Sequence, residues 1–304
     1  MAARMTLGDK PLDILAIAAH RDDVEQTCGG TLLRAAQRGQ RTGVLDLTQG
    51  ELGTRGTAED RAREAGDAAH ILGASWREAL DIPDGRVENT WDNRLKVAAV
   101  IRATRPRVVI LPYWKGRHPD HYTASVLGYE ACFLAGLAKL DVGSLAVSDQ
   151  PSAVRNPTEN AAPKGVSDDA LAAARLKARR DTNLPSSPRL GSARLAIEQA
   201  VMLSPHRPFK IIYATLYYDI RPTFVVDISD QFEGKLASIL AYASQFSDQE
   251  AGKGLFPAHE EIRVRVDAMA RFYGMLGGVT YAEPFLQKEV GLVDDLMAIP
   301  VKSI

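Results

Sequence analysis

A short apolar run followed by a segment with helical spacing occurs four times in succession before residue 140. The apolar runs are residues 12–19, 42–48, 75–80 and 106–112. Apolar runs of this length are typical of strands buried on both faces of a parallel sheet. Because the crossovers between parallel strands are right-handed, this alternation of strand and helix predicts a doubly wound α/β fold.

The pattern changes in residues 141–204, which are rich in proline, serine, alanine and aspartate. We interpret them as a helical or irregular insertion within a single domain that spans residues 1–304. The insertion could form a lid, make an oligomer contact or have no function. Further strands are expected at residues 209–217, 223–228 and 280–286, and further helices at residues 231–242 and 260–276. The expected fold is a Rossmann-like, mostly parallel sheet flanked by helices.

The composition excludes several classes of partner. The formal net charge of the 304 residues is -1, which gives no general attraction to nucleic acid or to an anionic membrane. No apolar segment reaches membrane-spanning length, and residues 1–10 lack the hydrophobic core of a secretory signal. We therefore expect a cytoplasmic protein. The only cysteines, Cys28 and Cys132, are interpreted as buried thiols.

Histidine and aspartate follow the first and the fourth of the expected strands. His20, Asp22 and Asp23 come after the first strand, and His118-Pro119-Asp120-His121 comes after the fourth. Open α/β sheets bind ligands at the carboxyl ends of their strands, so we expect the two loops to meet there. An imidazole beside two carboxylates is costly to bury without a cation, which favours a divalent metal site. The alternative is that these residues cap helices or lie in solvent. Two such loops at the same edge of one sheet count against this alternative.

A zinc ion in a hydrolase usually takes three protein ligands and leaves a fourth position to water. His20, Asp23 and either His118 or His121 would complete such a set. Asp22 could then accept the proton of the water molecule. The histidine that does not bind the metal could stabilise an oxyanion or protonate a leaving amine, and the residues alone do not choose between His118 and His121.

The same residues carry a resemblance to a known family. Residues 19–25, with Gly29 and Gly30, resemble the first signature of the PIG-L/LmbE family of zinc-dependent sugar N-deacetylases, and residues 118–121 resemble its second signature. Further stretches are similar to the bacillithiol-biosynthesis deacetylase branch of that family. They are residues 46–57, 82–85, 205–208 and 224–229. The resemblance covers nearly the whole chain outside residues 141–204.

The resemblance implies roles for five residues. His20, Asp23 and His121 would bind one zinc ion per chain, or iron(II) in the cell, because such a site accepts either metal. Asp22 would be the general base, and His118 the acid or the oxyanion stabiliser. In that branch the substrate is N-acetylglucosaminyl malate, and the products are acetate and the free amine. Relatives of the branch are often oligomeric, so a homo-oligomer is expected.

Three further residues are expected on the substrate side. Arg55 and Arg117 are suited to bidentate contacts with malate carboxylates or sugar hydroxyls, and Asp120 is suited to orient a neighbouring imidazole. Arg55 lies in a glycine-rich loop, residues 49–57, whose glycines let the backbone approach a ligand closely. The alternative for Arg55 is a salt bridge that orders its own loop. Arg21 stands where the family has proline, and it adds a charge near the metal.

Three functions compete on these observations. The first is a metal-dependent hydrolase that removes the acetyl group from an N-acetylglucosaminyl conjugate. The second is an amidase acting on a related thiol–sugar conjugate, and the third is a non-catalytic sugar-binding Rossmann-like protein. The complete set of metal-ligand and acid–base residues favours the first function over the third.

Overall fold

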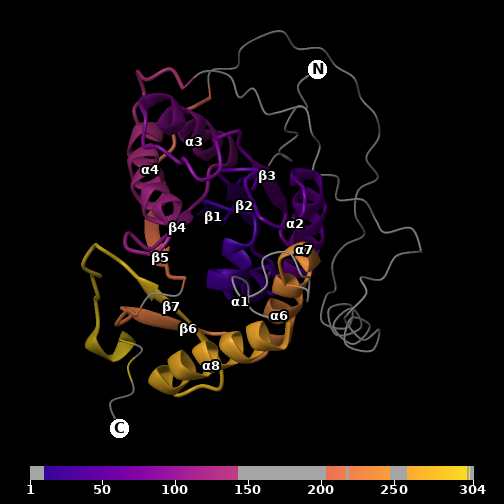
Figure 1. Ribbon diagram of the computed structural model, residues 1–304. Coiled ribbons are helices and arrows are strands. Elements are labelled where there is room, and N and C mark those ends of the chain that lie inside the picture. Colours follow the sequence, from indigo (N-terminus) through magenta and orange to yellow (C-terminus); the bar gives the residue numbers. More distant parts are fainter. Residues whose placement is uncertain (1–9, 143–202, 217–218, 247–258, 300, 302–304) are drawn as a thin grey trace.

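The computed structural model describes residues 10–142, 203–216, 219–246, 259–299 and 301. In these residues seven strands form one mixed sheet in the order β3-β2-β1-β4-β5-β7-β6 (Figure 1). The strands are β1 (Ile14–Ala18), β2 (Thr42–Asp46), β3 (Trp76–Ala79), β4 (Val108–Pro112), β5 (Lys210–Ala214), β6 (Phe224–Asp227) and β7 (Ala282–Leu286). The first five strands are parallel, and β7 runs antiparallel between β5 and β6. The predicted fold class is confirmed.

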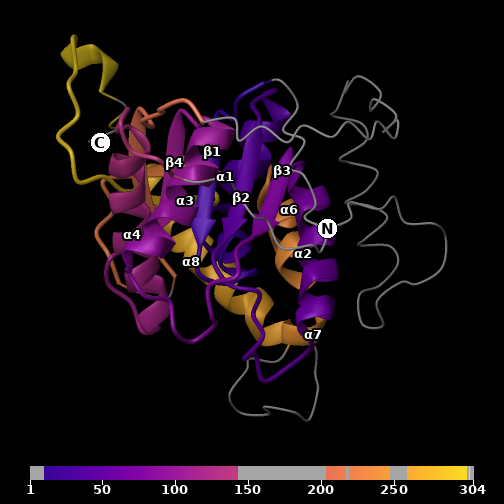
Figure 2. The same ribbon diagram turned by 90° about the horizontal axis from the view of Figure 1, so that it is seen from above.

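Helices cover both faces of the sheet, as Figure 1 shows for α3 and α4 on one side and for α1, α6 and α8 on the other. Figure 2 shows β4, β1, β2 and β3 side by side, with α4 and α2 on opposite sides of them. The helices are α1 (Asp23–Gln37), α2 (Ala58–Leu72), α3 (Trp91–Thr104), α4 (Pro119–Ala135), α6 (Phe232–Leu240), α7 (Ala243–Phe246) and α8 (His259–Gly277), with a 3-10 turn η1 (Leu296–Ala298).

Strand β1 lies at the centre of the sheet and contributes to the core on both faces. Leu15 and Ile17 are buried with residues of α3 and α4, whereas Ala16 and Ala18 are buried with residues of α1. This alternation follows from the two-residue period of a strand. The small alanine side chains keep α1 close to the sheet at the point where the first loop begins.

Local sequence signals set some helix ends but not all. The hydroxyl of Thr57 accepts the backbone N–H of Asp60, and the Asp60 carboxylate accepts the backbone N–H of Thr57, so α2 begins with a capping box. The sequence pattern also suggests a cap at Ser229, and this prediction is wrong. Helix α6 begins after Gln231, and the Ser229 hydroxyl donates to the carboxylate of Asp227 over 2.6 Å.

Expectations for the chain as a whole have different outcomes. The insertion predicted at residues 141–204 lies almost entirely outside the described residues, so it stays a prediction, as does the single domain. Cys28 and Cys132 are buried free thiols, as predicted, and burial raises the pKa of each to about 12. Within the part of the chain that the structure describes, no helix has the length and apolar character needed to cross a membrane.

Candidate active site

The loops that follow β1 and β4 meet at the carboxyl-end edge of the sheet. The two strands are paired neighbours although they are far apart in the sequence, and the strand order changes direction between them. Open α/β sheets bind ligands at such a point. His20 lies in the β1 loop, while His118 and His121 lie at the start of α4. Their three ring centroids are between 4.8 and 5.2 Å apart.

Three side chains present donor atoms to one point. Nδ1 of His20 is 3.2 Å from Nε2 of His121 and 3.4 Å from Oδ2 of Asp23. Nε2 of His121 is also 3.2 Å from Oδ1 of Asp23. Two ligands of a tetrahedral zinc ion, each bound at about 2.0–2.1 Å, lie about 3.3 Å apart. The three residues therefore fit a zinc ion in both donor type and spacing.

The other ring nitrogen of His20 contacts two carboxylates. Its Nε2 is 3.1 Å from Oδ1 of Asp84 and 3.3 Å from Oδ2 of Asp120. The two oxygens of Asp120 also accept the backbone N–H groups of Gly85 and Val87. A cluster formed by His20, Asp84 and Asp120 could itself hold a metal ion. Because backbone donors already occupy Asp120, we interpret both carboxylates as groups that orient His20, an arrangement typical of metal-binding histidines.

These contacts concern Asp120, which was expected in the site, and Asp84, which was not. Asp120 is 1% exposed and contacts Nε2 of His20, and its place on the substrate side stays a prediction. Asp84 has the same position and was missed as a site residue, because the sequence analysis cited residues 82–85 only for their resemblance to the bacillithiol branch. The signal that could have found it is its position, since the turn at Pro83-Asp84-Gly85 follows the third expected strand, at the same edge of the sheet.

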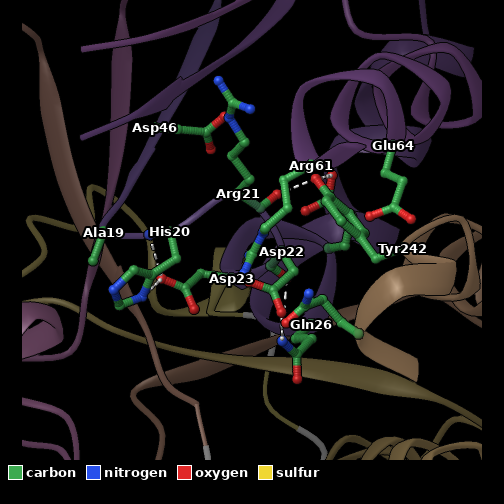
Figure 3. Close-up of polar contacts among 12 residues, drawn as sticks. Ala19, His20, Arg21, Asp22, Asp23, Gln26, Asp46, Arg61, Glu64 and Tyr242 are labelled. Carbon is green, nitrogen blue, oxygen red and sulfur yellow. Dashed lines mark hydrogen bonds and ion pairs between the residues drawn. The ribbon is translucent and has the colours of Figure 1, made fainter. Parts of the chain in front are cut away.

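The two adjacent carboxylates of the first loop point to different partners. In Figure 3 Asp23 points toward His20, whereas Asp22 points toward Arg61. Oδ1 of Asp22 is 2.8 Å from a guanidinium nitrogen of Arg61, which comes from α2, and Oδ2 has a 3.4 Å contact with the side-chain amide of Gln26. The two aspartates therefore have the separate orientations that separate roles require.

Arg61 also explains glycines that the sequence analysis assigned to ligand approach. Its side chain is only 6% exposed and lies beneath the loop between β2 and α2. A Cβ atom on Gly50 would lie 3.1 Å from Nε of Arg61, and one on Gly53 would lie 3.4 Å from Nη1. Gly50 also has a φ of 74°, a conformation that residues with a Cβ rarely adopt. The loop is thus shaped to make room for the guanidinium that holds Asp22.

The buried side chain of Arg77 holds the backbone of the loop that follows β1. Arg77 of β3 donates to both oxygens of Asp46, at 2.9 and 3.0 Å, and to Glu25 at 2.5 Å. It also donates to the backbone carbonyl of Arg21, which accepts the hydroxyl of Tyr242 as well. Arg77 of β3 and Tyr242, between α6 and α7, therefore both hold the backbone carbonyl of Arg21.

The side chain of Arg21 is accommodated away from the three imidazoles. It is 7% exposed, and it donates over 2.7 Å to the backbone carbonyl of Ala58, the first residue of α2. Burial lowers its pKa, although the nearby carboxylate of Asp46 raises it in part. In place of the family proline, this chain therefore has a side chain that ties the first loop to α2, the helix that carries Arg61.

The three imidazoles differ in proton affinity. Burial lowers the pKa of His20, but hydrogen bonds to three carboxylates, first that of Asp120, outweigh it and raise that pKa well above the usual value. Burial also lowers the pKa of His121, and the charge of Asp23 raises it overall. Burial and the charges of the other two imidazoles lower the pKa of His118. These shifts in pKa favour the protonated form of His20 and His121 and the neutral form of His118.

His118, Arg117 and Arg55 occupy different environments. His118 is exposed, and its ring lies 4.8 Å from that of His20 and 5.1 Å from that of His121. Its Nδ1 accepts the backbone N–H of Asp120. Arg117 precedes it in the chain and is also exposed. Arg55 is 4% exposed, donates to the backbone carbonyl of Gln245, and accepts the side-chain amide of Gln245 at its own carbonyl. These contacts hold Arg55 within its own part of the fold, as in the alternative in which it orders its own loop.

The chain is similar to known deacetylases. Residues 15–132 match the model of the PIG-L family, described as GlcNAc-PI de-N-acetylase. The diacetylchitobiose deacetylase of Thermococcus kodakarensis is 27% identical over 281 residues, which are 89% of this chain and 80% of that protein. The uncharacterized deacetylase YaiS of Escherichia coli is 33% identical over 147 residues, which are 42% of this chain and 79% of that protein.

A solved structure extends the similarity over the whole fold. The conserved protein TT1542 from Thermus thermophilus is 34% identical, with a TM-score of 0.65, and the match covers 93% of this chain and 98% of that one. The sheet order and the two acidic histidine loops define an α/β protein with a metal-type site at the carboxyl ends of its strands. The chain belongs to the PIG-L family of deacetylases. The family-level resemblance is confirmed, and the bacillithiol branch stays a prediction.

Proposed function

We propose that this protein is a metal-dependent hydrolase that removes the acetyl group from an N-acetylglucosaminyl conjugate. The observation that carries the proposal is the trio of donor atoms from His20, Asp23 and His121, which are 3.2–3.4 Å apart. Asp22 and His118 lie beside this trio with the chemistry that amide hydrolysis needs. Family membership supports the reaction, since relatives of this chain are named as deacetylases of acetylated sugars.

The trio would hold one zinc ion, and iron(II) suits the same donors. When bound, the ion polarises the acetyl carbonyl and acidifies a water molecule. Asp84 and Asp120 accept the Nε2–H of His20, which leaves Nδ1 with a lone pair directed at His121 and Asp23. Ligand atoms of His20, His118 and His121 also lie within 4.8 Å of one another, so His118 is the competing third ligand. We choose His121, because Nδ1 of His118 accepts a backbone N–H and its neutral ring then carries the proton on Nε2.

We assign to Asp22 the role of proton acceptor and to His118 the role of donor to the oxyanion. Arg61 holds Oδ1 of Asp22, so Oδ2, which has only a long contact with Gln26, is the oxygen that takes the proton of the attacking water. Since Nδ1 of His118 accepts a backbone N–H, the proton of the neutral ring lies on Nε2, where it can be donated to the oxyanion. The carbon–nitrogen bond then breaks, the nitrogen takes the proton held by Asp22, and acetate and the free amine leave.

N-acetylglucosaminyl malate is the substrate that we propose to test first. The sequence resembles the bacillithiol branch at residues 46–57, 82–85 and 224–229. Arg117 is exposed beside His118, where it could pair with a malate carboxylate. Arg55 is left out of this proposal because it is buried in its own loop. A homo-oligomer in the cytoplasm stays the expectation from the sequence.

The proposal is tested by measuring acetate release and bound metal on the same preparations. We expect Asp22→Ala to bind zinc but to lose about 10²–10⁴-fold in rate, because a positioned proton acceptor contributes that much. His20→Ala should lose both metal and activity. His70→Ala is the matched control, since His70 is exposed on α2 away from the trio.

Three outcomes would contradict parts of the proposal. Near-normal activity of Asp22→Ala would remove Asp22 as the general base. Release of amine from a thiol–sugar amide, with no release of acetate from acetylated sugars, would favour the amidase. A wild-type protein that binds no stoichiometric zinc, after purification without chelators, would favour the non-catalytic sugar-binding protein.

A further inference from the structure

Helix α1 is interrupted shortly after the loop that follows β1. Cys28 has a φ of -141° and a ψ of 17°, which lie outside the helical range. The interruption divides α1 into a leading segment, residues 23–27, and a trailing segment, residues 29–37. The leading segment begins with Asp23, and Asp22 is its N-cap. The orientation of the leading segment therefore decides where the two aspartates of the site lie.

A buried ion pair from two other elements occupies the interruption. Lys235 of α6 and Glu283 of β7 are 3% and 2% exposed, and Nζ lies 2.5 Å from Oε1. Nζ of Lys235 also donates to the backbone carbonyl of Gln26 over 2.7 Å. Oε1 of Glu283 accepts the N–H of Gly30 over 2.9 Å, and Oε2 accepts the N–H of Thr31 over 2.7 Å. In a regular helix the N–H of Gly30 would donate to the carbonyl of Gln26, so the ion pair meets both groups of one helical hydrogen bond.

The two charges suit the helix ends that they meet. The ammonium group of Lys235 lies at the carbonyl end of the leading segment, and the carboxylate of Glu283 lies at the N–H end of the trailing segment. Each charge is opposite in sign to the partial charge of that helix end. The hydroxyl of Thr31 also donates to Oε2 of Glu283 over 2.6 Å. The ion pair therefore acts as a cap for both segments.

Gly30 permits a close approach at this point. A Cβ atom on Gly30 would lie 2.9 Å from Cδ1 of Ile228, well inside the usual separation of about 3.5–4.0 Å between carbon atoms. Helix α1 lies next to α6 in Figure 1. The residues that meet here are far apart in the sequence, since 209 residues separate Lys235 from Gln26 and 253 separate Glu283 from Gly30.

We propose that Lys235 and Glu283 are positioning residues, which keep α1 interrupted and so place Asp22 and Asp23 for hydrolysis. This inference rests on the proposed function, since it concerns the same site. The path from the ion pair to the site is short. Lys235 holds the backbone of Gln26, and the side-chain amide of Gln26 contacts Oδ2 of Asp22 at 3.4 Å.

Stability alone does not account for a charged pair at this place. The cost of removing two charges from water can exceed the gain from their attraction, and apolar residues of similar volume often stabilise a fold equally well. An apolar pair would leave the carbonyl of Gln26 free to accept the N–H of Gly30, which would make α1 regular and turn its leading segment. The contribution that requires charge is therefore the interruption itself.

The test compares Lys235→Met with Arg102→Met on an N-acetylglucosaminyl substrate. We expect Lys235→Met to lower kcat by about 10–100-fold with KM within about threefold of wild type, because a misplacement of about 1 Å can cost about 100-fold. Its zinc affinity should fall by about tenfold or more, since Asp23 moves with the leading segment.

Arg102→Met is the matched control because it also removes a buried cation from helix carbonyls. Arg102 is 4% exposed and donates to the carbonyls of Ala135 and Leu137 at the end of α4. Helix α4 has 17 residues, so this end is about 25 Å along the helix from the site. At a temperature at which both variants are fully folded, Arg102→Met should keep kcat and zinc affinity within about twofold of wild type.

Thr31 gives a milder test that does not depend on the folding of Lys235→Met. Thr31→Val removes the hydroxyl that donates to Glu283 and keeps the shape of the side chain, whereas Thr31→Ser keeps the hydroxyl. We expect Thr31→Val to lower kcat by about threefold to tenfold with KM unchanged, and Thr31→Ser to match wild type. A merely structural role would lower the unfolding free energy of Thr31→Val and leave kcat of the folded protein unchanged.

The outcomes separate this inference from the proposed function. Wild-type kcat in folded Lys235→Met or in Thr31→Val, or an equal loss in Arg102→Met, would overturn the positioning role and leave the deacetylase standing. No release of acetate by zinc-loaded wild-type protein would overturn the deacetylase. The zinc affinities would then still decide whether the ion pair places Asp23, because a loss in Lys235→Met alone supports that placement and wild-type affinity contradicts it.

Discussion

Replacing Asp84 by alanine should weaken metal binding while the protein stays folded. Nε2 of His20 has two carboxylate partners, Asp84 at 3.1 Å and Asp120 at 3.3 Å. The variant removes the closer partner and leaves Asp120, which two backbone N–H groups keep in place. Loss of such an outer partner typically lowers metal affinity by about 10–100-fold. Because one partner remains, we expect a loss of about 10–30-fold, which is about 1.4–2 kcal/mol of binding free energy.

The assay is a zinc competition titration against a chelating dye, with the unfolding free energy measured in parallel. Asp81→Ala is the matched control, because Asp81 lies in the same connection between β3 and α3 but is 61% exposed and pairs with Lys96. It should bind zinc within about twofold of wild type, since an exposed ion pair contributes little. Wild-type affinity in Asp84→Ala, or an equal loss in Asp81→Ala, would refute the reasoning that His20 is oriented by its carboxylate partners.

Three further predictions concern the support of the site. Arg21→Pro removes one charged hydrogen bond, to Ala58, so we expect the unfolding free energy to fall by about 1.5–3 kcal/mol in urea titrations, with zinc affinity within about threefold of wild type. Arg77→Met leaves the carboxylates of Asp46 and Glu25 buried without their cation, which should cost about 3–5 kcal/mol of unfolding free energy. Burial, opposed by Arg77, already raises the pKa of Glu25 from 4.5 to about 7, so this carboxyl contributes stability below pH 4.5 that is lost as the pH rises through 7. The loss in Arg77→Met should therefore be larger at pH 8 than at pH 5, and an equal loss at both would contradict it. Finally, the raised pKa values of the two ligand imidazoles predict that zinc binding releases protons and weakens as the pH falls, which calorimetry in buffers of different ionisation enthalpy would show.

Local sequence patterns predicted most of the strands and helices. They predicted fewer of the side-chain contacts between them. The expected strand at residues 12–19 is β1 (Ile14–Ala18), and the expected helix at residues 260–276 is α8 (His259–Gly277). The cap assigned to Ser229 failed because its hydroxyl oxygen accepts the backbone N–H of Tyr281, and its O–H donates to Asp227. A local pattern does not show that a distant segment supplies the N–H that a cap would accept. The sequence left two roles open for Arg55, because it does not show that a loop arginine is buried, and the substrate role stays a prediction.

The sequence by itself determined that this chain forms a doubly wound α/β sheet and that histidine and aspartate follow its first and fourth strands. Those conclusions depend on periodicity and on order along the chain, which a sequence contains. Only the tertiary structure decided that β4 pairs with β1, which brings His20 within 3.2 Å of His121 across 101 residues. It also decided that His118 is turned by its hydrogen bond at the start of α4, and that Asp22, the residue around which the chemistry is proposed, is held by Arg61. These facts depend on distances between segments far apart in the chain, and such distances are set by strand order and packing.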